Sequence, residues 1–534
     1  MPANRFVPDW TNPIRIPDNV SVKRAVPDFA IAGETGSWQL PLQVDRDLTG
    51  ASVLNLQLWG GRNSKKAFAE PQVHHPHSAG YVTARGPDGK ELLMAAEKID
   101  GTFSVGIPPG GLEAESVITV TLGGGEGAGK GIKTVPWRML DKCFVLYRPE
   151  DEDDFPSIWN WENNHRIVAA CTMHVLGGEV EQLRAYVPAR TFPGEPFDLL
   201  VRPEDRFSNL SSCPLDRVEI NGGTDAEVGS QMQVPDSTCL RVRVTLNQEG
   251  VVRLGVSDPE SGHEAITNPT VCYPEYRGSN WYWGMIHGHT ELSDGAGNIE
   301  YYFRQMKDEA ALDFAAPADH DHVDETSDKM WQVSTDAVRR WHEPGNFVTF
   351  PGYEWSKWRR NGDGDRNVYY LHDDRPMYRS DKANYPHPRD LFTALQHEQA
   401  LVIPHHPGHK GNWCDWQEHA PELERLVEIY QNRGSYECAA QEGNPLPEKP
   451  PEGMVASGLI RRALAMGWRV GFTAGGDDHV GHSGTEFPID SGSGYKAGLM
   501  AVSATEKTRE AIWDAMWHRR VVATSGPRII LNYW

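Results

Sequence analysis

Histidines and carboxylates gather in short clusters in the second half of the chain, where 15 of the 21 histidines lie from His287 onward. The clusters are His287-Gly288-His289 with Asp294 shortly after, Asp319-His320-Asp321-His322, Tyr353-Glu354-Trp355, Pro404-His405-His406-Pro407-Gly408-His409 and Gly475-Gly476-Asp477-Asp478-His479. Imidazole and carboxylate are ligands that suit zinc, manganese and iron, and no cysteine falls in any cluster. The residue types therefore predict bound metal ions.

The spacing within the clusters supports the same chemistry. Alternate residues of a strand point to the same side, so His287 and His289 can bind one ion, as can Asp477 and His479. A carboxylate such as Glu354 can bridge two ions, and water held between them ionises near neutral pH. A single His-x-His pair carries no weight, because 21 histidines among 534 residues produce about one such pair by chance. The weight comes from several clusters that each follow an apolar, strand-like segment.

Strands and helices alternate along the part of the chain that carries these clusters. Strands are predicted at 282–286, 312–316, 401–403, 469–472 and 499–502, and helices near 298–311, 389–399, 455–466 and 506–519. Repeating strand–helix units predict a parallel sheet, either closed as a barrel or open and doubly wound. In both cases the site lies at the carboxyl ends of the strands, where the clusters fall.

The first half of the chain has a different pattern, made of short apolar stretches separated by Gly, Pro and Asp. Examples are 116–122, 197–201 and 240–244, with turn residues recurring about every ten positions. This spacing is typical of antiparallel β-sandwich modules. We predict two such modules, at 1–160 and 161–277, followed by an α/β domain at 278–534. The Gly-rich stretch 123–129 is predicted to be a loop and the acidic stretch 150–154 a connector.

Composition excludes several classes of function. The 534 residues carry 52 Lys and Arg against 74 Asp and Glu, a formal net charge of −22, which disfavours general binding to nucleic acids or anionic membranes. No apolar run reaches the length of a membrane span and no secretory signal follows Met1. The seven cysteines contain no Cys-x-x-Cys pair, which favours reduced thiols. With Met1 as the native start, these features predict a cytoplasmic protein.

The order of the clusters also resembles a known family. His-x-His with a following Asp-Gly, then Asp-His-Asp, a lone Glu, His-Pro-Gly and Asp-x-His, over about residues 280–480, resembles the PHP (polymerase and histidinol phosphatase) superfamily. The tail from Thr508 to Ile529 resembles a poorly characterised branch whose members often carry β-rich N-terminal regions. The resemblance implies a distorted (β/α)7 barrel that holds two or three divalent ions of Mn, Zn or Fe.

The resemblance also implies which residues bind each ion. The first ion takes His287, His289 and Asp477, with Glu354 as the bridge to a second ion. The second ion takes a histidine of the His405-His406 doublet, which leaves open which ring ligates. The third ion takes Asp294, His320 and His479. The family often has another second-ion histidine after the bridging Glu, and the nearest choices here are Asp365 and His372. Glu428 either ligates directly or accepts a hydrogen bond from a ligand histidine.

The predicted activity is that of a metal-dependent hydrolase that uses a metal-activated water. A phosphoester substrate is implied by the resemblance alone, and another ester, an amide, another C–O bond, redox chemistry or a metal-stabilised module without turnover remain alternatives. The candidate general acids are Asp477, His322 and His409.

Other side chains predict features of a small-molecule substrate. Arg433 and Arg528 are candidates to bind an anionic group, or else are ordinary salt-bridge partners. Tyr430 and the tryptophans Trp355, Trp358, Trp413 and Trp416 suggest a partly apolar or aromatic substrate, or else pack against the β-rich half. The sequence leaves the oligomeric state open.

Overall fold

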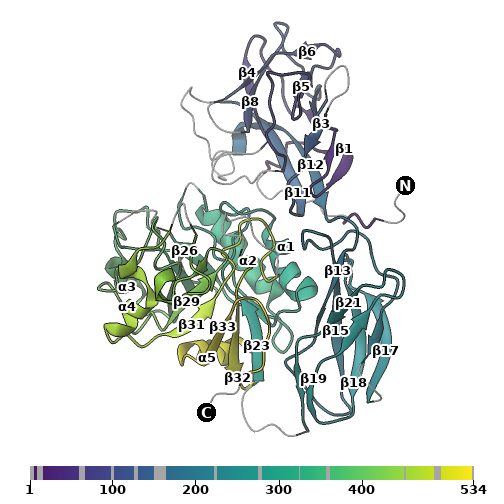
Figure 1. The fold of residues 1–534 in the computed structure, drawn as a ribbon. Helices are drawn as coiled ribbons and strands as arrows, with labels where there is room; N and C mark the ends of the chain where they lie inside the picture. The colour runs from purple at the N-terminus through teal and green to yellow at the C-terminus, as the bar shows by residue number, and fades with distance from the viewer. Residues whose placement is uncertain are drawn as a thin grey trace. The chain divides into compact units, whose positions relative to one another are not determined.

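The structure is a computed structural model that describes residues 5–8, 16–58, 67–97, 101–124, 130–149, 164–221, 225–274, 280–323, 325–356, 361–449, 453–485 and 495–531. The chain divides into two compact units (Figure 1). The N-terminal unit comprises 7–178 with 291–298, and the C-terminal unit comprises 1–6, 179–290 and 299–534. The acidic stretch 150–154, most of the Gly-rich loop, Trp358 and both predicted domain boundaries, at 160/161 and 277/278, lie outside the described residues.

The N-terminal unit is built almost entirely from strands. A ten-stranded arrangement has the order β6-β5-β9-β3-β1-β12-β11-β4-β8-β7, and β2 pairs with β10. The bounds are β1 (Val22–Ile31), β2 (Thr35–Gly36), β3 (Trp38–Gln43), β4 (Val53–Gln57), β5 (Val82–Arg85), β6 (Glu91–Leu92), β7 (Met94–Ala96), β8 (Thr102–Gly106), β9 (Val117–Leu122), β10 (Ile132–Lys133), β11 (Met139–Tyr147) and β12 (Ile167–Leu176), with a 3-10 turn η1 (Asn164–Arg166). The strand predicted at 116–122 is confirmed as β9, whose residues alternate between buried and half-buried. Strand β12, which follows the predicted boundary at 160/161, pairs with β1 and β11 of this unit.

The C-terminal unit begins with residues 179–274, here named the β module. Its strands are β13 (Gln182–Tyr186), β14 (Arg190–Thr191), β15 (Pro196–Glu204), β16 (Glu219–Asn221), β17 (Ala226–Gln233), β18 (Leu240–Leu246), β19 (Gly250–Val252), β20 (Gly255–Ser257), β21 (Glu264–Ile266) and β22 (Thr270–Cys272). They form the sheets β13-β15-β18-β17, β14-β22-β19 and β16-β20-β21. The inward residues of β15 and β18, among them Leu199 and Val242, bury a core together with Val256 and Cys272 of the other two sheets. The strands predicted at 197–201 and 240–244 are thus confirmed.

The remainder of this unit, here named the α/β region, alternates strands and helices. Its elements are β23 (Asn280–Met285), α1 (Ile299–Arg304), the π-helical turn η2 (Gln305–Glu309), β24 (Phe314–Ala315), α2 (Asp328–Trp341), β25 (Val348–Thr349), β26 (Gly352–Trp355), β27 (Arg366–Tyr370), α3 (Pro388–Leu395), β28 (Ala400–Pro404), β29 (Leu426–Gln431), β30 (Gly434–Ser435), η3 (Ala440–Glu442), η4 (Ala456–Gly458), α4 (Ile460–Ala465), β31 (Gly471–Ala474), β32 (Leu499–Ala504), α5 (Arg509–Trp517) and β33 (Val521–Thr524). All nine predicted segments match elements of this series, although two of the predicted helices are interrupted, at η2 and between η4 and α4. Helix α2 was not predicted.

The strands of the α/β region pair in a mixed way. They form three sheets in the orders β25-β24-β23-β32-β33, β26-β27-β28 and β30-β29-β31. Among the described residues, β23–β24, β24–β25 and β29–β31 are parallel, and the other five pairings are antiparallel. The parallel sheet predicted from the alternation is therefore present only in part. Strands β26 and β27 are the clearest exception, because they follow each other in the chain and pair antiparallel from Gly352 with Tyr369 to Trp355 with Arg366. Closure into a (β/α)7 barrel stays a prediction.

Isolated bridges and helix packing tie the three sheets together. Gly288 pairs with Asp478, and His320 pairs with Glu354, each in a parallel bridge. Thr508 caps the N-terminus of helix α5, where its side chain accepts a hydrogen bond from the Ala511 N–H. The helix packs Ile512 into the core around Met500. None of the described helices has the length and apolar character needed to cross a membrane.

Candidate metal centre

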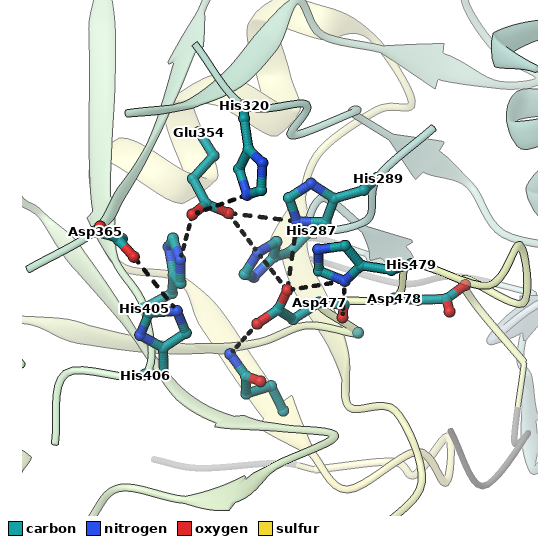
Figure 2. Close-up of polar contacts among 12 residues, drawn as sticks. His287, His289, His320, Glu354, Asp365, His405, His406, Asp477, Asp478 and His479 are labelled. Atoms are coloured by element: carbon teal, nitrogen blue, oxygen red, sulfur yellow. Dashed lines mark hydrogen bonds and ion pairs between the residues drawn. The ribbon is translucent and has the colours of Figure 1, made fainter. Parts of the chain in front are cut away.

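The predicted ligands converge although they come from five separate parts of the α/β region (Figure 2). His287 and His289 follow β23, His320 follows β24, Glu354 lies in β26, His405 and His406 follow β28, and Asp477 and His479 follow β31. Apart from His479, these side chains are buried. Strand ends therefore position the candidate ligands, as the clusters indicated, while their roles as metal ligands stay predictions.

A first group of ligand atoms comes from His287, His289, Glu354 and Asp477, and its atoms lie within 4.8 Å of one another. Glu354 Oε2 is 3.5 Å from His287 Nε2 and 3.3 Å from His289 Nε2. Asp477 Oδ1 is 3.7 Å from His287 Nε2 and 3.3 Å from His289 Nε2. Two imidazoles and two carboxylates thus face a common point, which is the donor set predicted for the first ion.

A second group consists of Glu354, Asp365, His405 and His406. Glu354 Oε1 is 3.4 Å from His405 Nε2, and Asp365 Oδ2 is 3.9 Å from His406 Nε2. Both rings of the histidine doublet therefore belong to the group. Asp365 is here as well, whereas His372 bonds to Gln399 Oε1 at 2.6 Å on the surface. Asp365 and His372 were the two candidates for the position of the family's second-ion histidine, and Asp365 is the one that lies in this group.

A third group gathers around His289. Its ring centroid is 4.7 Å from that of His320 and 3.9 Å from that of His479. His320 Nε2 is 3.7 Å from Glu354 Oε1, and His479 Nδ1 is 3.6 Å from Asp477 Oδ1. Asp294 belongs to the segment 291–298 of the N-terminal unit, so its part in this group stays a prediction.

Several buried ring nitrogens in these groups fit a metal ion better than they fit a protein partner. His405 Nε2, which faces Glu354 Oε1 at 3.4 Å, is buried and makes no hydrogen bond with any described residue. His287 Nε2 faces its two carboxylates at 3.5 and 3.7 Å, which is too long for a good hydrogen bond. Buried polar atoms nearly always have a partner, so this arrangement of imidazoles and carboxylates fits divalent ions.

The charges around the rings also suit coordination. Burial lowers the pKa of His287, but the carboxylates of Glu428 and Glu354 outweigh it and raise that pKa to about 9. Burial, assisted by the neighbouring His405, holds the pKa of His406 well below its usual range. A metal ion needs the lone pair of a neutral imidazole, which is the form that the lowered pKa favours at His406.

Carboxylates behind the rings fix their orientation. His287 Nδ1 donates to both oxygens of Glu428 at 3.0 and 2.9 Å, which matches the hydrogen-bonding alternative for Glu428. His320 Nδ1 donates to Glu325 Oε2 at 2.7 Å. Each pair leaves the ring's Nε2 directed at the centre. Glu325 was missed by sequence reasoning, and its one signal is a carboxylate five residues after a candidate ligand.

Replacement of Glu428 by glutamine is expected to weaken metal affinity by about 10- to 100-fold. The amide keeps the shape of the side chain but removes the negative charge that orients His287 and supports its Nδ1–H. Isothermal titration with Mn²⁺ or Zn²⁺ measures the change. Glu437→Gln is the matched control, because Glu437 forms an exposed salt bridge with Arg461 and is expected to leave the affinity unchanged. Equal affinities in the two variants would show that Glu428 does not support the centre.

The predicted catalytic side chains differ in how near they lie to the ligand groups. Arg433 contacts Asp477 and donates to Gln431 Oε1 at 2.9 Å, with 27% of its side chain exposed. His409 lies 5.3 Å from His406 between ring centroids, and its Nδ1 donates to Glu448 Oε1 at 2.8 Å.

The remaining candidates have contacts of a different kind. His322 donates through Nε2 to the Ser356 carbonyl at 2.8 Å. Arg528 binds the carbonyls of Ala310 and Ala311 and stacks on the Tyr186 ring at 4.4 Å, so it fixes the backbone beside η2 and lies outside the ligand groups.

The aromatic residues predicted to line a substrate entrance are largely part of the core. Trp355 is fully buried among Tyr353, Val368 and Leu391. Trp416 is also buried, and its Nε1 donates to the Gly458 carbonyl at 2.9 Å. Tyr430 donates to the Lys496 carbonyl at 3.0 Å, and Trp413 is half-buried. Trp355 and Trp416 instead complete the core of the α/β region, around β26 and the segment 414–463, and neither core cluster includes a residue of the β-rich half.

Comparisons with known proteins find a family of unknown function over part of the chain and uncharacterised relatives over most of it. Residues 296–443 and 476–534 match a family described as "Protein of unknown function (DUF3604)". An uncharacterized protein of Chlamydia pneumoniae is 24% identical over 526 residues, which are 95% of this chain and 82% of that protein. An uncharacterized protein of Chlamydia trachomatis is 25% identical over 535 residues, 96% of this chain and 82% of that protein.

Solved structures are similar only at a low level. A two-domain protein of Bacteroides vulgatus, described as containing a predicted PHP-like metal-dependent phosphoesterase, is 17% identical with a TM-score of 0.33, over 47% of this chain and 66% of that chain. Invasin, a bacterial integrin-binding protein, is 11% identical with a TM-score of 0.20, over 66% of this chain and 56% of that chain. Similarity at this level carries no argument about function, which must come from the residues of this chain.

Proposed function

We propose that this protein is a metal-dependent hydrolase of the PHP type that acts on a small phosphoester. The observation that carries the proposal is the position of the Glu354 carboxylate. Its Oε2 faces His287 and His289, at 3.5 and 3.3 Å. Its Oε1 faces His320 and His405, at 3.7 and 3.4 Å. A carboxylate with imidazoles on both oxygens has the environment of a bridge between two cations.

The chain's own residues suit hydrolysis at this centre. Bound divalent ions would supply Lewis acidity and would activate a water near neutral pH. Asp477 directs Oδ1 toward the histidines, while Gln431 Nε2 donates to its Oδ2 at 3.0 Å and Arg433 contacts the same oxygen. These donors occupy Oδ2 and leave Oδ1 directed at the ring nitrogens, so Asp477 serves better as a ligand than as the general acid.

Arg433 and His409 then take the two remaining roles. Arg433, partly exposed beside Asp477, presents the guanidinium that would bind an anionic oxygen of the substrate. His409 donates Nδ1–H to Glu448, which orients the ring so that its Nε2 would carry the proton for the leaving group.

Metal analysis followed by a substrate screen tests the proposal. Protein reconstituted separately with Mn²⁺, Zn²⁺ and Fe²⁺ is assayed with p-nitrophenyl phosphate, bis-p-nitrophenyl phosphate, a p-nitrophenyl carboxyl ester and an anilide. We expect turnover of a phosphoester with at least one of these ions. Turnover restricted to the carboxyl ester or the anilide would keep the hydrolase and replace the substrate class. A metal-loaded protein that turns over none of them, together with unchanged metal content in Glu354→Ala, would refute the hydrolase.

A further inference from the structure

The loop that carries Asp477 and His479 is closed by its own hydrogen bonds. Asp478 Oδ1 accepts from the Val480 N–H at 2.8 Å, and the other oxygen accepts from the His482 N–H. The Asp478 carbonyl accepts from the His289 N–H at 2.8 Å. Asp477 has a φ of +48°, a left-handed conformation that costs free energy in a non-glycine residue. Because Asp477 is held in this unfavourable conformation, contacts from outside the loop help to keep the ligands in place.

One of these outside contacts comes from the β module, about 270 residues earlier in the chain. His482 Nε2 bonds to Asn209 Oδ1 at 2.7 Å. Asn209 Nδ2 donates to Asp205 Oδ2 at 2.9 Å, which fixes the amide so that its oxygen faces the imidazole. Asp205 Oδ1 in turn accepts from the N–H groups of Phe207 and Asn209, at 2.8 and 2.9 Å. The side chains form one continuous polar chain from the module to the loop.

This polar chain is buried from end to end. Asn209 is 0% exposed, and Asp205 and His482 are each 2% exposed. Without solvent to replace a lost partner, each hydrogen bond constrains its neighbour strongly. The β module is also fixed to the α/β region near this point, because Arg202 pairs with Glu309 of η2 at 3.5 Å. Gln305 of the same turn donates to the Ser483 carbonyl at 2.9 Å, which holds the far side of the loop.

We propose that Asn209 is a positioning residue for the metal centre, and that the β module shapes the loop 477–483 through the Asn209–His482 hydrogen bond. The inference rests on the proposed function, since it concerns how that centre is assembled. The loop supplies Asp477 to the first ligand group and His479 to the third, but nothing to the group of Glu354, Asp365, His405 and His406. Loss of the hydrogen bond should therefore weaken the ions bound by the loop and spare the ion bound by the second group.

Asn209→Leu tests this selectivity, with Asn268→Leu as the matched control. Asn268 lies in the same module, where it bonds to the backbone of Val187, so its loss perturbs the module without touching the loop. Co²⁺ titration of the full-length protein, followed by visible absorption and calorimetry, resolves the classes of site. We expect Asn209→Leu to weaken the loop-dependent class by about 10-fold and to leave the other class within twofold of wild type. Asn268→Leu is expected to change neither.

A second pair of variants keeps the test decisive if Asn209→Leu fails to fold. In His482→Gln the amide nitrogen takes the place of the ring Nε2 and can still donate to Asn209, whereas His482→Asn is too short to reach it. We expect His482→Asn to lose about 10-fold in loop-dependent affinity and His482→Gln to lose clearly less. Equal losses in the pair, or wild-type metal binding in Asn209→Leu, would overturn the positioning role while leaving the hydrolase intact. Wild-type protein that binds no metal would overturn both.

Discussion

Replacement of Glu354 by glutamine is expected to reduce kcat/KM for the best phosphoester by at least about 10³-fold, because the ions are asked to supply several kcal/mol of transition-state stabilisation. The amide fills the same volume but can no longer bridge two cations with two anionic oxygens. The histidine pairs His287/His289 and His320/His405 would then face each other without the charge that lies between them. Metal content by elemental analysis is expected to fall together with activity.

The control for this variant is Glu343→Gln, which alters an exposed carboxylate paired with Lys307. It is expected to keep wild-type activity and metal content. Glu354→Gln protein that retains both its metal and its activity would show that Glu354 is not the bridge. Retained metal with lost activity would instead assign Glu354 to the chemistry and leave the other ligands to hold the ions.

Local patterns were sufficient to predict most of the elements that deliver the ligands, although β26, which carries Glu354, was not predicted. His287 and His289 follow an apolar strand, and Asp477 and His479 follow another, so their convergence follows from where strand ends meet. Whether neighbouring strands pair parallel or antiparallel could not be predicted in the same way. The antiparallel strand β27, Arg366–Tyr370, buries an arginine and an asparagine, and its pattern gave no strand prediction.

The partners of the ligands were harder to predict, because they depend on contacts between distant segments. Asp365 is set in place by the buried Arg366, whose guanidinium binds the carbonyls of Asp363 and Gly364 and pairs with Glu424 at 2.7 Å. Nothing near Asp365 in the sequence indicates this network. The bond between Asn209 and His482 crosses 273 positions and likewise leaves no local signal.

The buried charges that join the β module to the α/β region lead to a stability prediction. Arg202 is 1% exposed, its Nε is 3.0 Å from Glu204 Oε1, and its Nη1 is 3.5 Å from Glu309 Oε2. Burial disfavours the charge on Arg202, but the two carboxylates more than compensate and raise its pKa. Arg202→Met leaves both carboxylates buried, with Arg184, 3.3 Å from Glu204, as the remaining cation. Removal of one partner from a buried pair costs about 3–5 kcal/mol.

Arg243→Met is the matched control, since Arg243 pairs with Asp198 at 2.8 Å with both side chains more than 40% exposed. An exposed pair contributes less than about 1 kcal/mol, so in calorimetry the C-terminal unit of Arg202→Met should unfold several degrees below that of Arg243→Met. The loss of stability in Arg202→Met should also depend on pH. Burial raises the pKa of Glu204 above its ordinary value, although Arg202 opposes this shift. Without Arg202 that pKa rises further, so folding favours protonation of Glu204 and the loss of stability relative to wild type narrows as the pH falls toward the ordinary carboxyl pKa. If Arg202→Met lost no more stability than Arg243→Met, and the loss stayed constant with pH, Glu204 and Glu309 would not depend on Arg202 for their burial.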